Sequence, residues 1–405
     1  MRPQQLSART VSVLGARWWS APLVLAVSAL CRVLLSFLTP NGLNMVDLRV
    51  YTYGAASVAH GGLYIFTFSD MTPNFPLPFT YPPFAALLFF PLHLITFSLL
   101  AVLWQLGTIA ALWGVVRISL QLLLGARADE PQWRAAAALW AALGVWLEPV
   151  RTTLDYGQVN VFLMLGVFLA ARTTRWWMAG ALVGGLAGVK LTPAVTGLYF
   201  LARRNLAAAV FSAVAFVATV ALSFAVLPAE ARTYFGTLVR DTSRIGPVGS
   251  AINQSLRGVL SRFAGHDVGT GAVWLVAVAC AAGLCLLAWR GLDAGDRLGT
   301  MIVVQLFGLL VSPISWSHHW VWLVPALLWL VHGPLRRTPA ATITALVWIV
   351  VLLVGVIQLL LLQQPTIWAV HRPVLASVGG AIYPVGAAAI LVLMVAQRRL
   401  VRASG

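Results

Sequence analysis

Long apolar segments recur along this chain from residue 21 to residue 397, separated by short polar stretches that are rich in arginine. Several of them approach the roughly 20 residues that an α-helix needs to cross a bilayer. Of the 405 residues, 60% are hydrophobic and 9% are charged, against about 25% charged residues in an average soluble domain. The pattern therefore predicts an all-α integral membrane protein that crosses the membrane many times.

The distribution of the basic residues predicts the topology. The chain holds 27 Lys and Arg residues and has a formal net charge of +16, but these residues lie singly or in pairs between apolar segments. We therefore expect contact with anionic membrane lipids and no nucleic-acid binding. Placing the more basic connections in the cytoplasm gives about twelve spans with both termini cytoplasmic. The first span follows Arg2, Arg9 and Arg17 and is expected to be a retained signal anchor.

We expect a single membrane domain over residues 1–405. Its expected parts are a cytoplasmic N-terminus (1–19), a first span (20–39), an external loop with interfacial helices (40–96), spans two to seven (97–227), a second external loop (228–271), spans eight to twelve (272–397) and a cytoplasmic tail (398–405). In this scheme residues 148–160 form an external turn. Residues 176–202 form two short helices that meet at an external break beside Lys190.

The unusual polar residues fall at the external ends of the expected spans. Ionisable groups at membrane depth are costly and are usually paired or functional. The candidate site residues are Asp47, Arg49, Tyr51, Tyr81, Glu148, Arg151, Gln158, Asn160, Lys190, His318 and His319. Each has a functional and a purely structural interpretation.

Asp47 lies shortly after the first span and is the candidate general base toward a hydroxyl group. A helix N-cap, or an ion pair with Arg49, is the structural alternative. Tyr51 and Tyr81 could stack on sugar rings, or belong to the aromatic belt at the membrane interface.

Lys190 is the one lysine of the chain. A compact ammonium group at an apolar break suits the binding of a phosphate, although a lysine retained by chance is the alternative. His318 and His319 could also contact phosphate, or serve as interfacial aromatic residues. The polar group of Glu148, Arg151, Gln158 and Asn160 could bind substrate or form a network at helix ends.

Several kinds of chemistry lack their sequence motifs. The chain has no phosphate-binding P-loop, no dinucleotide fingerprint, no HExxH and no GxSxG. Cys31, Cys280 and Cys285 lie in apolar segments without metal-ligand spacing. We therefore expect no metal or other cofactor. An external enzyme site without access to nucleotides would need a donor carried by a lipid.

These features resemble the GT-C glycosyltransferases. Four short segments, over residues 47–51, 81–84, 157–160 and 188–193, are similar to motifs of the polyprenol-phosphate-mannose-dependent α-1,2-mannosyltransferases of actinobacteria, most of all those acting on phosphatidylinositol mannosides. The resemblance covers most of residues 20–330. It implies a GT-C-like fold in the plasma membrane, with its active site on the external face.

The resemblance also implies a reaction. An inverting displacement would move mannose from polyprenyl-phosphate-mannose to a mannosylated phosphatidylinositol, or to lipomannan in sibling enzymes. Asp47 would act as the base, while Lys190 with His318 or His319, and with Arg151, would stabilise the leaving phosphate. A transporter or lipid flippase is the alternative from another class. That class favours a central site and inverted repeats with matched helix breaks, and no second break matches the one at Lys190.

Overall fold

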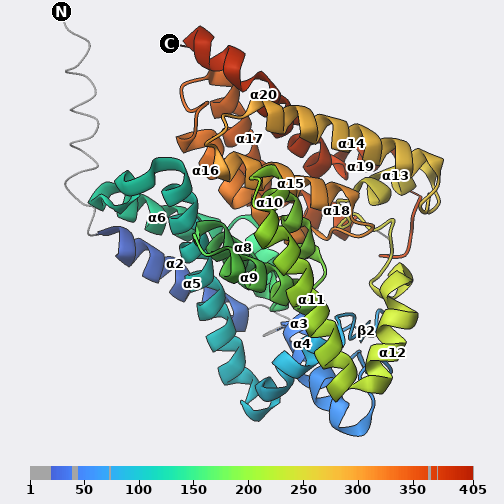
Figure 1. Ribbon diagram of the computed structural model, residues 1–405. Helices are drawn as coiled ribbons and strands as arrows, with labels where there is room; N and C mark the ends of the chain where they lie inside the picture. The colour runs from blue at the N-terminus through green and yellow to red at the C-terminus, as the bar shows by residue number, and fades with distance from the viewer. Residues whose placement is uncertain (1–19, 39–43, 73, 364–365, 372, 405) are drawn as a thin grey trace, which may run out of the picture.

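The computed structural model (Figure 1) describes residues 20–38, 44–72, 74–363, 366–371 and 373–404. The N-terminus expected to be cytoplasmic, residues 1–19, lies outside the described residues, as do residues 39–43 at the start of the first expected loop. Within the described part the chain is mostly helical. Its two strands, β1 (Thr67–Phe68) and β2 (Leu77–Pro78), form one short antiparallel pair. The helical fold predicted from the apolar segments is confirmed.

Within the described residues, five helical segments are long and apolar enough to cross a membrane, and a sixth arises if one bent pair is a single span. The five are α2 (Ala21–Leu38), α5 with η5 (Phe97–Leu124 and Gly125–Asp129), α11 (Leu206–Val226), α14 (Ala272–Gly291) and α17 with α18 (Pro339–Val354 and Val356–Leu362). The bent pair is α7 (Glu148–Tyr156) and α8 (Asn160–Arg172), which meet at 118°.

Other segments that were expected as spans or interfacial helices are shorter apolar helices. They are α4 with η4 (Pro83–Phe89 and Phe90–Leu94), α9 (Trp176–Val189), η6 with α10 (Thr192–Val195 and Thr196–Ala202), α15 (Arg297–Val311) and the first part of α20 (Ile382–Ser404). The 14 residues of α9 give a helix of about 21 Å, against a hydrocarbon core of about 30 Å. Length and composition alone therefore support five or six spans among the described residues.

The remaining helices connect these segments or lie in the two large loops. They are α3 (Val46–Arg49), η2 (Val50–Gly54), η3 (Ser57–His60), α6 (Pro131–Gly144), α12 (Pro228–Gly236), η7 (Leu238–Arg240), η8 (Thr242–Arg244), α13 (Leu256–Ala264), η9 (Ser317–Trp322), α16 (Leu323–His332) and α19 (Val374–Gly379). The helices α3, α4 and α12 gather at one end of the molecule, at the bottom of Figure 1.

Residues 148–160 are not the turn that the sequence predicted but hold α7 and a tight link to α8. Pro149 lies in the first turn of α7, where its missing N–H costs no hydrogen bond. The prediction failed because Glu148 suggested a solvated turn, whereas Glu148 is buried and accepts a hydrogen bond of 3.0 Å from Tyr383 Oη. Gly157 ends the helix with a φ of 69°.

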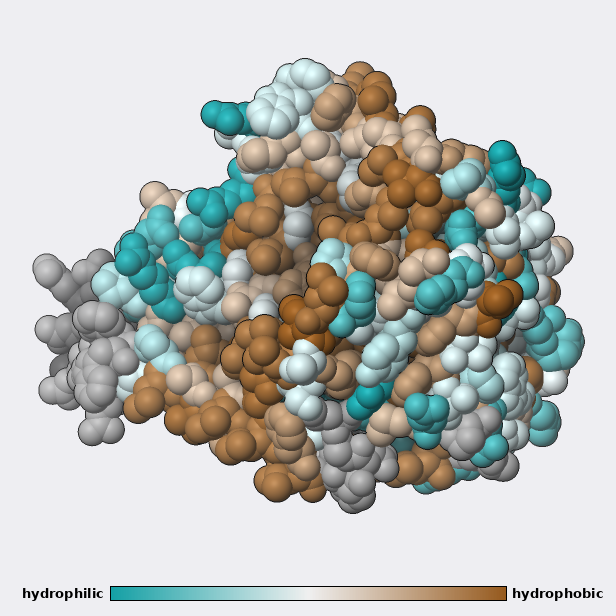
Figure 2. Space-filling model, turned by 90° about the horizontal axis from the view of Figure 1, so that it is seen from below, coloured by the Kyte–Doolittle hydropathy of each residue, from teal (hydrophilic) through white to brown (hydrophobic). Residues whose placement is uncertain are grey.

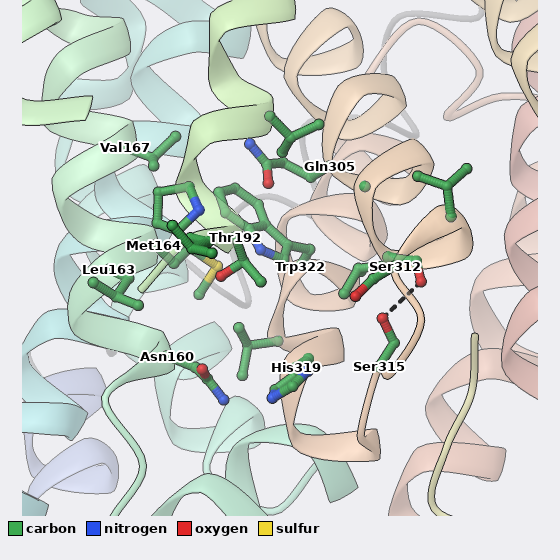
Figure 3. A pocket seen from close by; sticks show the side chains of 17 residues that line it. Asn160, Leu163, Met164, Val167, Thr192, Gln305, Ser312, Ser315, His319 and Trp322 are labelled. Atoms are coloured by element: carbon green, nitrogen blue, oxygen red, sulfur yellow. Dashed lines mark hydrogen bonds between the residues drawn. The ribbon is translucent and has the colours of Figure 1, made fainter. Parts of the chain in front are cut away.

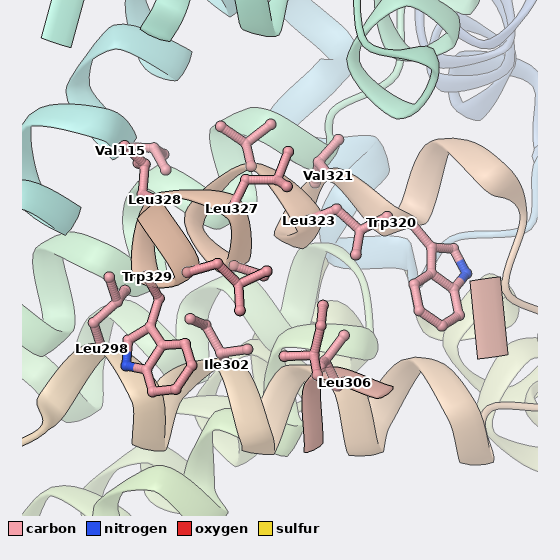
Figure 4. Close-up of a cluster of buried hydrophobic side chains, with 14 of the residues drawn as sticks. Val115, Leu298, Ile302, Leu306, Trp320, Val321, Leu323, Leu327, Leu328 and Trp329 are labelled. Atoms are coloured by element: carbon pink, nitrogen blue, oxygen red, sulfur yellow. The ribbon is translucent and has the colours of Figure 1, made fainter. Parts of the chain in front are cut away.

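The largest apolar core lies around α15 and α16 (Figure 4). Trp320 and Trp329 have no exposed surface there. The indole nitrogen of Trp329 donates a hydrogen bond of 2.7 Å to Asp296 Oδ2, which caps the start of α15. Burying one large apolar side chain contributes about 1.5–3 kcal/mol. This core therefore fixes η9, which carries His318 and His319.

Small residues bring α9 and α11 into close contact. Gly180, Gly184 and Gly188 follow one another at four-residue spacing along one face of α9. A Cβ atom on Gly180 would lie 2.9 Å from the backbone oxygen of Ala208, and one on Gly188 would collide with Thr219. Glycine at such positions allows helix backbones in membranes to approach closely. The contact fixes the end of α9, where Lys190 follows.

Large apolar side chains remain exposed along the candidate spans. On α11, Leu206, Val210, Val214 and Val217 are each more than half exposed. Figure 2 shows broad areas of apolar side chains on the surface, with hydrophilic residues gathered in separate patches. Such surface is far larger than a soluble monomer exposes, and it matches a lipid environment. The protein is therefore a helical membrane protein.

Candidate active site

Asp47 is held in place by the backbone around it. The short helix α3 begins after Met45, which has a left-handed φ of 40° and donates its backbone N–H to the carbonyl of Asp155 at 3.0 Å. Val46 and Leu48 are buried, so Asp47 between them projects in another direction and stays partly exposed. The helix α3 is thereby docked on the end of α7.

Gly157 allows this docking. A Cβ atom at Gly157 would lie 2.6 Å from Cβ of Leu48 and 3.4 Å from its backbone nitrogen. The φ of 69° at this residue is also one that only glycine adopts freely. The link between α7 and α8 can therefore press against α3, which brings Gln158 to Asp47.

Gln158 joins Asp47 to two buried tyrosines. The amide oxygen of Gln158 accepts hydrogen bonds from Tyr51 Oη at 2.8 Å and from Tyr81 Oη at 3.3 Å, and the two hydroxyl oxygens lie 2.8 Å apart. The side chain of Gln158 also lies close enough to the carboxylate of Asp47 to act on it as a hydrogen-bond donor, which lowers the pKa of that carboxyl. Four residues from three distant segments thus form one polar cluster.

Lys190 forms the other half of the site. Its Nζ atom donates to Asn160 Oδ1 at 2.9 Å and lies 3.3 Å from Nε2 of His319. The same atom lies 5.4 Å from the ring centre of Tyr81, within the range of a cation–π interaction. Lys190 follows the last residue of α9, so the helix break expected from the sequence is present. Tyr81 connects the two halves of the site.

The electrostatics of the site couple these two halves. Burial raises the pKa of the Asp47 carboxyl to about 6, although the hydrogen bond from Gln158 and the charge of Lys190 oppose the rise. Burial also lowers the pKa of Lys190 to about 8, and the charge of Asp47 opposes that fall. Near neutral pH the site therefore contains a carboxylate and an ammonium group, the protonation states suited to a general base and a phosphate-binding cation.

The two histidines differ in their surroundings. The backbone carbonyl of His318 accepts hydrogen bonds from Asn160 Nδ2 at 2.9 Å and from Thr153 Oγ1 at 3.2 Å. Burial, together with the charge of Lys190, lowers the pKa of His319 well below its ordinary value. A neutral His319 that accepts from Lys190 at Nε2 carries its proton on Nδ1. That Nδ1 atom is buried and has no hydrogen-bond partner among the described residues.

A cavity of about 300 Å³ opens beside this cluster. Asn160 and His319 lie together at one end of it and Gln305 lies at the other (Figure 3). The lining between them is mostly apolar and comes from α8, α15, η6 and η9. It includes Leu163, Met164, Val167, Pro193, Leu309 and Trp322. The cavity therefore combines a polar end, next to Lys190, with an apolar chamber.

The family model of glycosyltransferase family 87 matches residues 79–313, more than half of the chain. The chain belongs to glycosyltransferase family 87.

Curated relatives agree with this membership. A polyprenol-phosphate-mannose-dependent α-(1-2)-phosphatidylinositol pentamannoside mannosyltransferase of Mycobacterium tuberculosis is 52% identical over 95% of this chain and 88% of its own length. The protein of the same name from Mycolicibacterium smegmatis is 52% identical over 92% of this chain and 90% of its own length. A phosphatidylinositol mannoside mannosyltransferase of the latter organism is 35% identical over 69% of this chain and 64% of its own length. No solved structure shows a significant match.

Three predicted site residues of this family 87 protein have their contacts elsewhere. Arg49 places its guanidinium 3.9 Å from the ring centre of Phe97 and donates to the carbonyl of Asn44 at 3.2 Å. Glu148 accepts a hydrogen bond from Tyr383 Oη, and Arg151 lies beside Gly355. The structure therefore groups the other predicted site residues, namely Asp47, Tyr51, Tyr81, Gln158, Asn160, Lys190, His319 and, through its backbone, His318.

Other site features were missed by the sequence analysis. Arg32 is buried within α2 and forms an ion pair with Asp155. This ion pair fixes the C-terminal end of α7, on which α3 is docked through the hydrogen bond from Met45 to Asp155. Thr192 and Gln305 line the cavity. The available signals were an arginine inside an apolar span and a lone amide in the apolar segment 301–311. Among the described residues, no group of three or more His, Cys, Asp or Glu side chains could hold a metal ion.

Proposed function

We propose that this family 87 protein transfers mannose from polyprenyl-phosphate-mannose to a hydroxyl group of a mannosylated phosphatidylinositol. The product would be an α-1,2 linkage formed with inversion. The observation that carries the proposal is one partly enclosed site in which Asp47 and Lys190 interact electrostatically, beside a largely apolar cavity. The names of the relatives that are 52% identical support the donor, and point to a phosphatidylinositol pentamannoside as the acceptor.

Asp47 would act as the general base. Its carboxylate takes the proton of the acceptor hydroxyl while the hydroxyl oxygen bonds to the anomeric carbon. The bond from that carbon to the phosphate oxygen breaks, and its electron pair leaves with the lipid phosphate. A base with a pKa of about 6 is strong enough to help and is still ionised at neutral pH.

Lys190 and His319 would bind the leaving phosphate. The ammonium group neutralises the charge that develops on the phosphate, and the Nδ1–H of His319 offers a donor without a protein partner among the described residues. Donors held in place before the reaction stabilise such charge most effectively. His318 would contribute through its backbone, since its carbonyl positions Asn160 and thereby Lys190.

The apolar cavity would hold the first units of the polyprenyl chain. Its polar end lies at His319 and Asn160, where the phosphate would sit, and its lining away from that end is mostly apolar (Figure 3). Burial of hydrocarbon is favourable by about 25 cal/mol per Å². Tyr51, Tyr81 and Gln158 would contribute to the base side of the site, and Arg49, Glu148 and Arg151 to its structural frame.

For the topology we propose twelve spans, with both termini in the cytoplasm and the site at the external face of the plasma membrane. The short helices α9, α10 and α15 would complete the spans together with their neighbours. The basic residues favour this orientation, since the proposed cytoplasmic segments hold 17 of the 27.

The test is a direct assay of the purified protein in detergent or nanodiscs. It would be supplied with polyprenyl-phosphate-mannose and a panel of phosphatidylinositol mannosides, and the products would be read by mass spectrometry and linkage analysis. We expect one added mannose in α-1,2 linkage on the pentamannoside, and no product from a nucleotide sugar alone. Transfer from a nucleotide sugar, or no transfer with any acceptor, would contradict the proposal.

A further inference from the structure

Gln158 has an unusually constrained side chain. It is only 4% exposed, and its amide oxygen accepts from both Tyr51 and Tyr81. An amide presents one acceptor end and one donor end. With two hydroxyl groups on the oxygen, the donor end is left for the carboxylate of Asp47.

The two tyrosines are held as rigidly as the amide. The ring of Tyr51 stacks on Phe89 at 4.7 Å and meets Tyr81 edge-on at 5.2 Å. Tyr81 is tied further by its backbone carbonyl, which accepts from Tyr64 Oη at 2.9 Å. Neither tyrosine ring can turn without breaking this packing, so both hydroxyl groups stay directed at Gln158.

Both tyrosines also remain protonated throughout the working pH range. Burial, with the charge of Asp47 adding to it, raises the pKa of each phenol above its ordinary value. Each hydroxyl group therefore keeps its proton, and because their oxygens lie 2.8 Å apart, one can donate to the other while the other donates to Gln158. An amide flip would turn the Gln158 NH₂ group toward them and its oxygen toward the Asp47 carboxylate, which is repulsive.

We propose that Gln158, locked by Tyr51 and Tyr81, is a positioning residue that orients the carboxylate of Asp47. The amide donates to one carboxylate oxygen and leaves the other free to meet the acceptor hydroxyl. This inference rests on the proposed role of Asp47 as the base. Tyr51 and Tyr81 thereby act on the reaction through Gln158, and not by stacking on a sugar.

The test compares pH profiles of kcat/KM for Gln158→Leu, Tyr51→Phe and the double variant. A hydrogen bond to a charged group stabilises that charged form, so its loss should move the acidic limb up by about one pH unit. At pH 7 that shift would leave about half of the Asp47 carboxyl groups ionised, so we expect kcat/KM there to fall roughly twofold and to fall further at lower pH, with the KM for the lipid donor unchanged. In the Gln158→Leu background, Tyr51→Phe should have little further effect, because the two act as one unit.

Tyr199→Phe is the matched control, since it removes the hydroxyl group of another buried tyrosine, on α10, whose apolar cluster does not include Gln158, Tyr51 or Tyr81. It should leave the acidic limb in place. A folded Gln158→Leu or Tyr51→Phe protein with a wild-type pH profile would overturn the inference. Asp47→Asn separates the two proposals: if it is inactive while the Gln158 and Tyr51 variants behave as wild type, only the positioning role fails. If Asp47→Asn is active, the proposed base itself is wrong.

Discussion

Nζ of Lys190 lies 3.3 Å from Nε2 of His319, which leaves the opposite ring nitrogen of the histidine as a buried donor without a partner among the described residues. His318 also has a buried ring nitrogen without a partner among the described residues, Nε2, but the histidine that contacts Lys190 is His319, and His318 contacts Asn160 and Thr153 through its backbone carbonyl. The sequence could not decide between the two histidines. The geometry favours His319 as the phosphate contact.

The first prediction concerns these phosphate-side residues. Lys190→Ala should lower kcat/KM for the lipid donor by roughly a hundredfold or more, since it removes the charge opposite the leaving group. His319→Ala should cost about tenfold, the value of one hydrogen bond to a charged group. Steady-state kinetics at varied donor concentration measures both. His318→Phe is the comparison, and it should stay close to wild type; equal losses at both histidines would contradict the assignment.

The second prediction concerns Asp47→Asn. Loss of a general base should slow turnover by about 10²- to 10⁴-fold, while donor binding persists. An N-cap role for Asp47 predicts normal activity instead, because asparagine caps as well as aspartate. No side-chain cap hydrogen bond is present at the start of α3. Single-turnover assays with labelled donor would separate the chemical step from binding.

The stability of the same variant gives an independent result. Because the folded protein raises the pKa of Asp47 to about 6, folding favours the neutral acid, and that contribution is lost as the pH rises through about 6. At pH 7.5 the uncharged amide introduced by Asp47→Asn should therefore leave the melting temperature unchanged or higher. Asp70→Asn, at an exposed position of the same loop, is the control for both measurements.

The third prediction concerns Gly157→Ala. The added methyl group would collide with Leu48, and alanine is strained at a φ of 69°. We expect α3 to move away from the link between α7 and α8, so that activity falls strongly and the protein loses about 1–3 kcal/mol of stability. Gly185→Ala is matched to it, since nothing lies within 4 Å of a Cβ there. That helical position should tolerate alanine, so an equal effect of the two substitutions would be unexpected.

Local patterns in the sequence predicted much of the fold. The break at Lys190 followed from a lysine and a proline inside an apolar run, and the helices of the two large loops followed from their composition. These features depend on neighbours along the chain. The expected twelve spans are not reached by length and composition, which support five or six spans among the described residues because helices such as α9 and α15 are short. The helix α7 was mistaken for a turn because its polar residues are paired inside the protein.

The contacts that build the site could not be predicted in the same way. Gln158 meets Tyr51 across 107 residues of chain, and Arg32 meets Asp155 across 123. Such pairs depend on how the helices pack against one another, and the hydrophobic pattern along the sequence does not predict that packing. The residues themselves were found through short motifs similar to those of a known family. The structure adds that Gln158 lies between Asp47 and the two tyrosines, whereas Arg49, Glu148 and Arg151 have contacts of their own.

The fourth prediction is a bell-shaped pH profile. Asp47 can accept a proton only above its pKa of about 6, and Lys190 is positively charged only below its pKa of about 8. The profile of kcat/KM, which reports groups of the free enzyme, should therefore rise through about pH 6, peak near 7 and fall through about 8.

Lys190→Arg tests the assignment of the alkaline limb. A guanidinium group stays protonated to beyond pH 12, so this variant should keep the limb near 6 and lose the one near 8. Its maximal rate should fall, because a planar guanidinium replaces a compact ammonium group beside Asn160 and His319. Asp47→Glu should move only the acidic limb. Retention of the alkaline limb in the arginine variant would mean that another group, and not Lys190, titrates there.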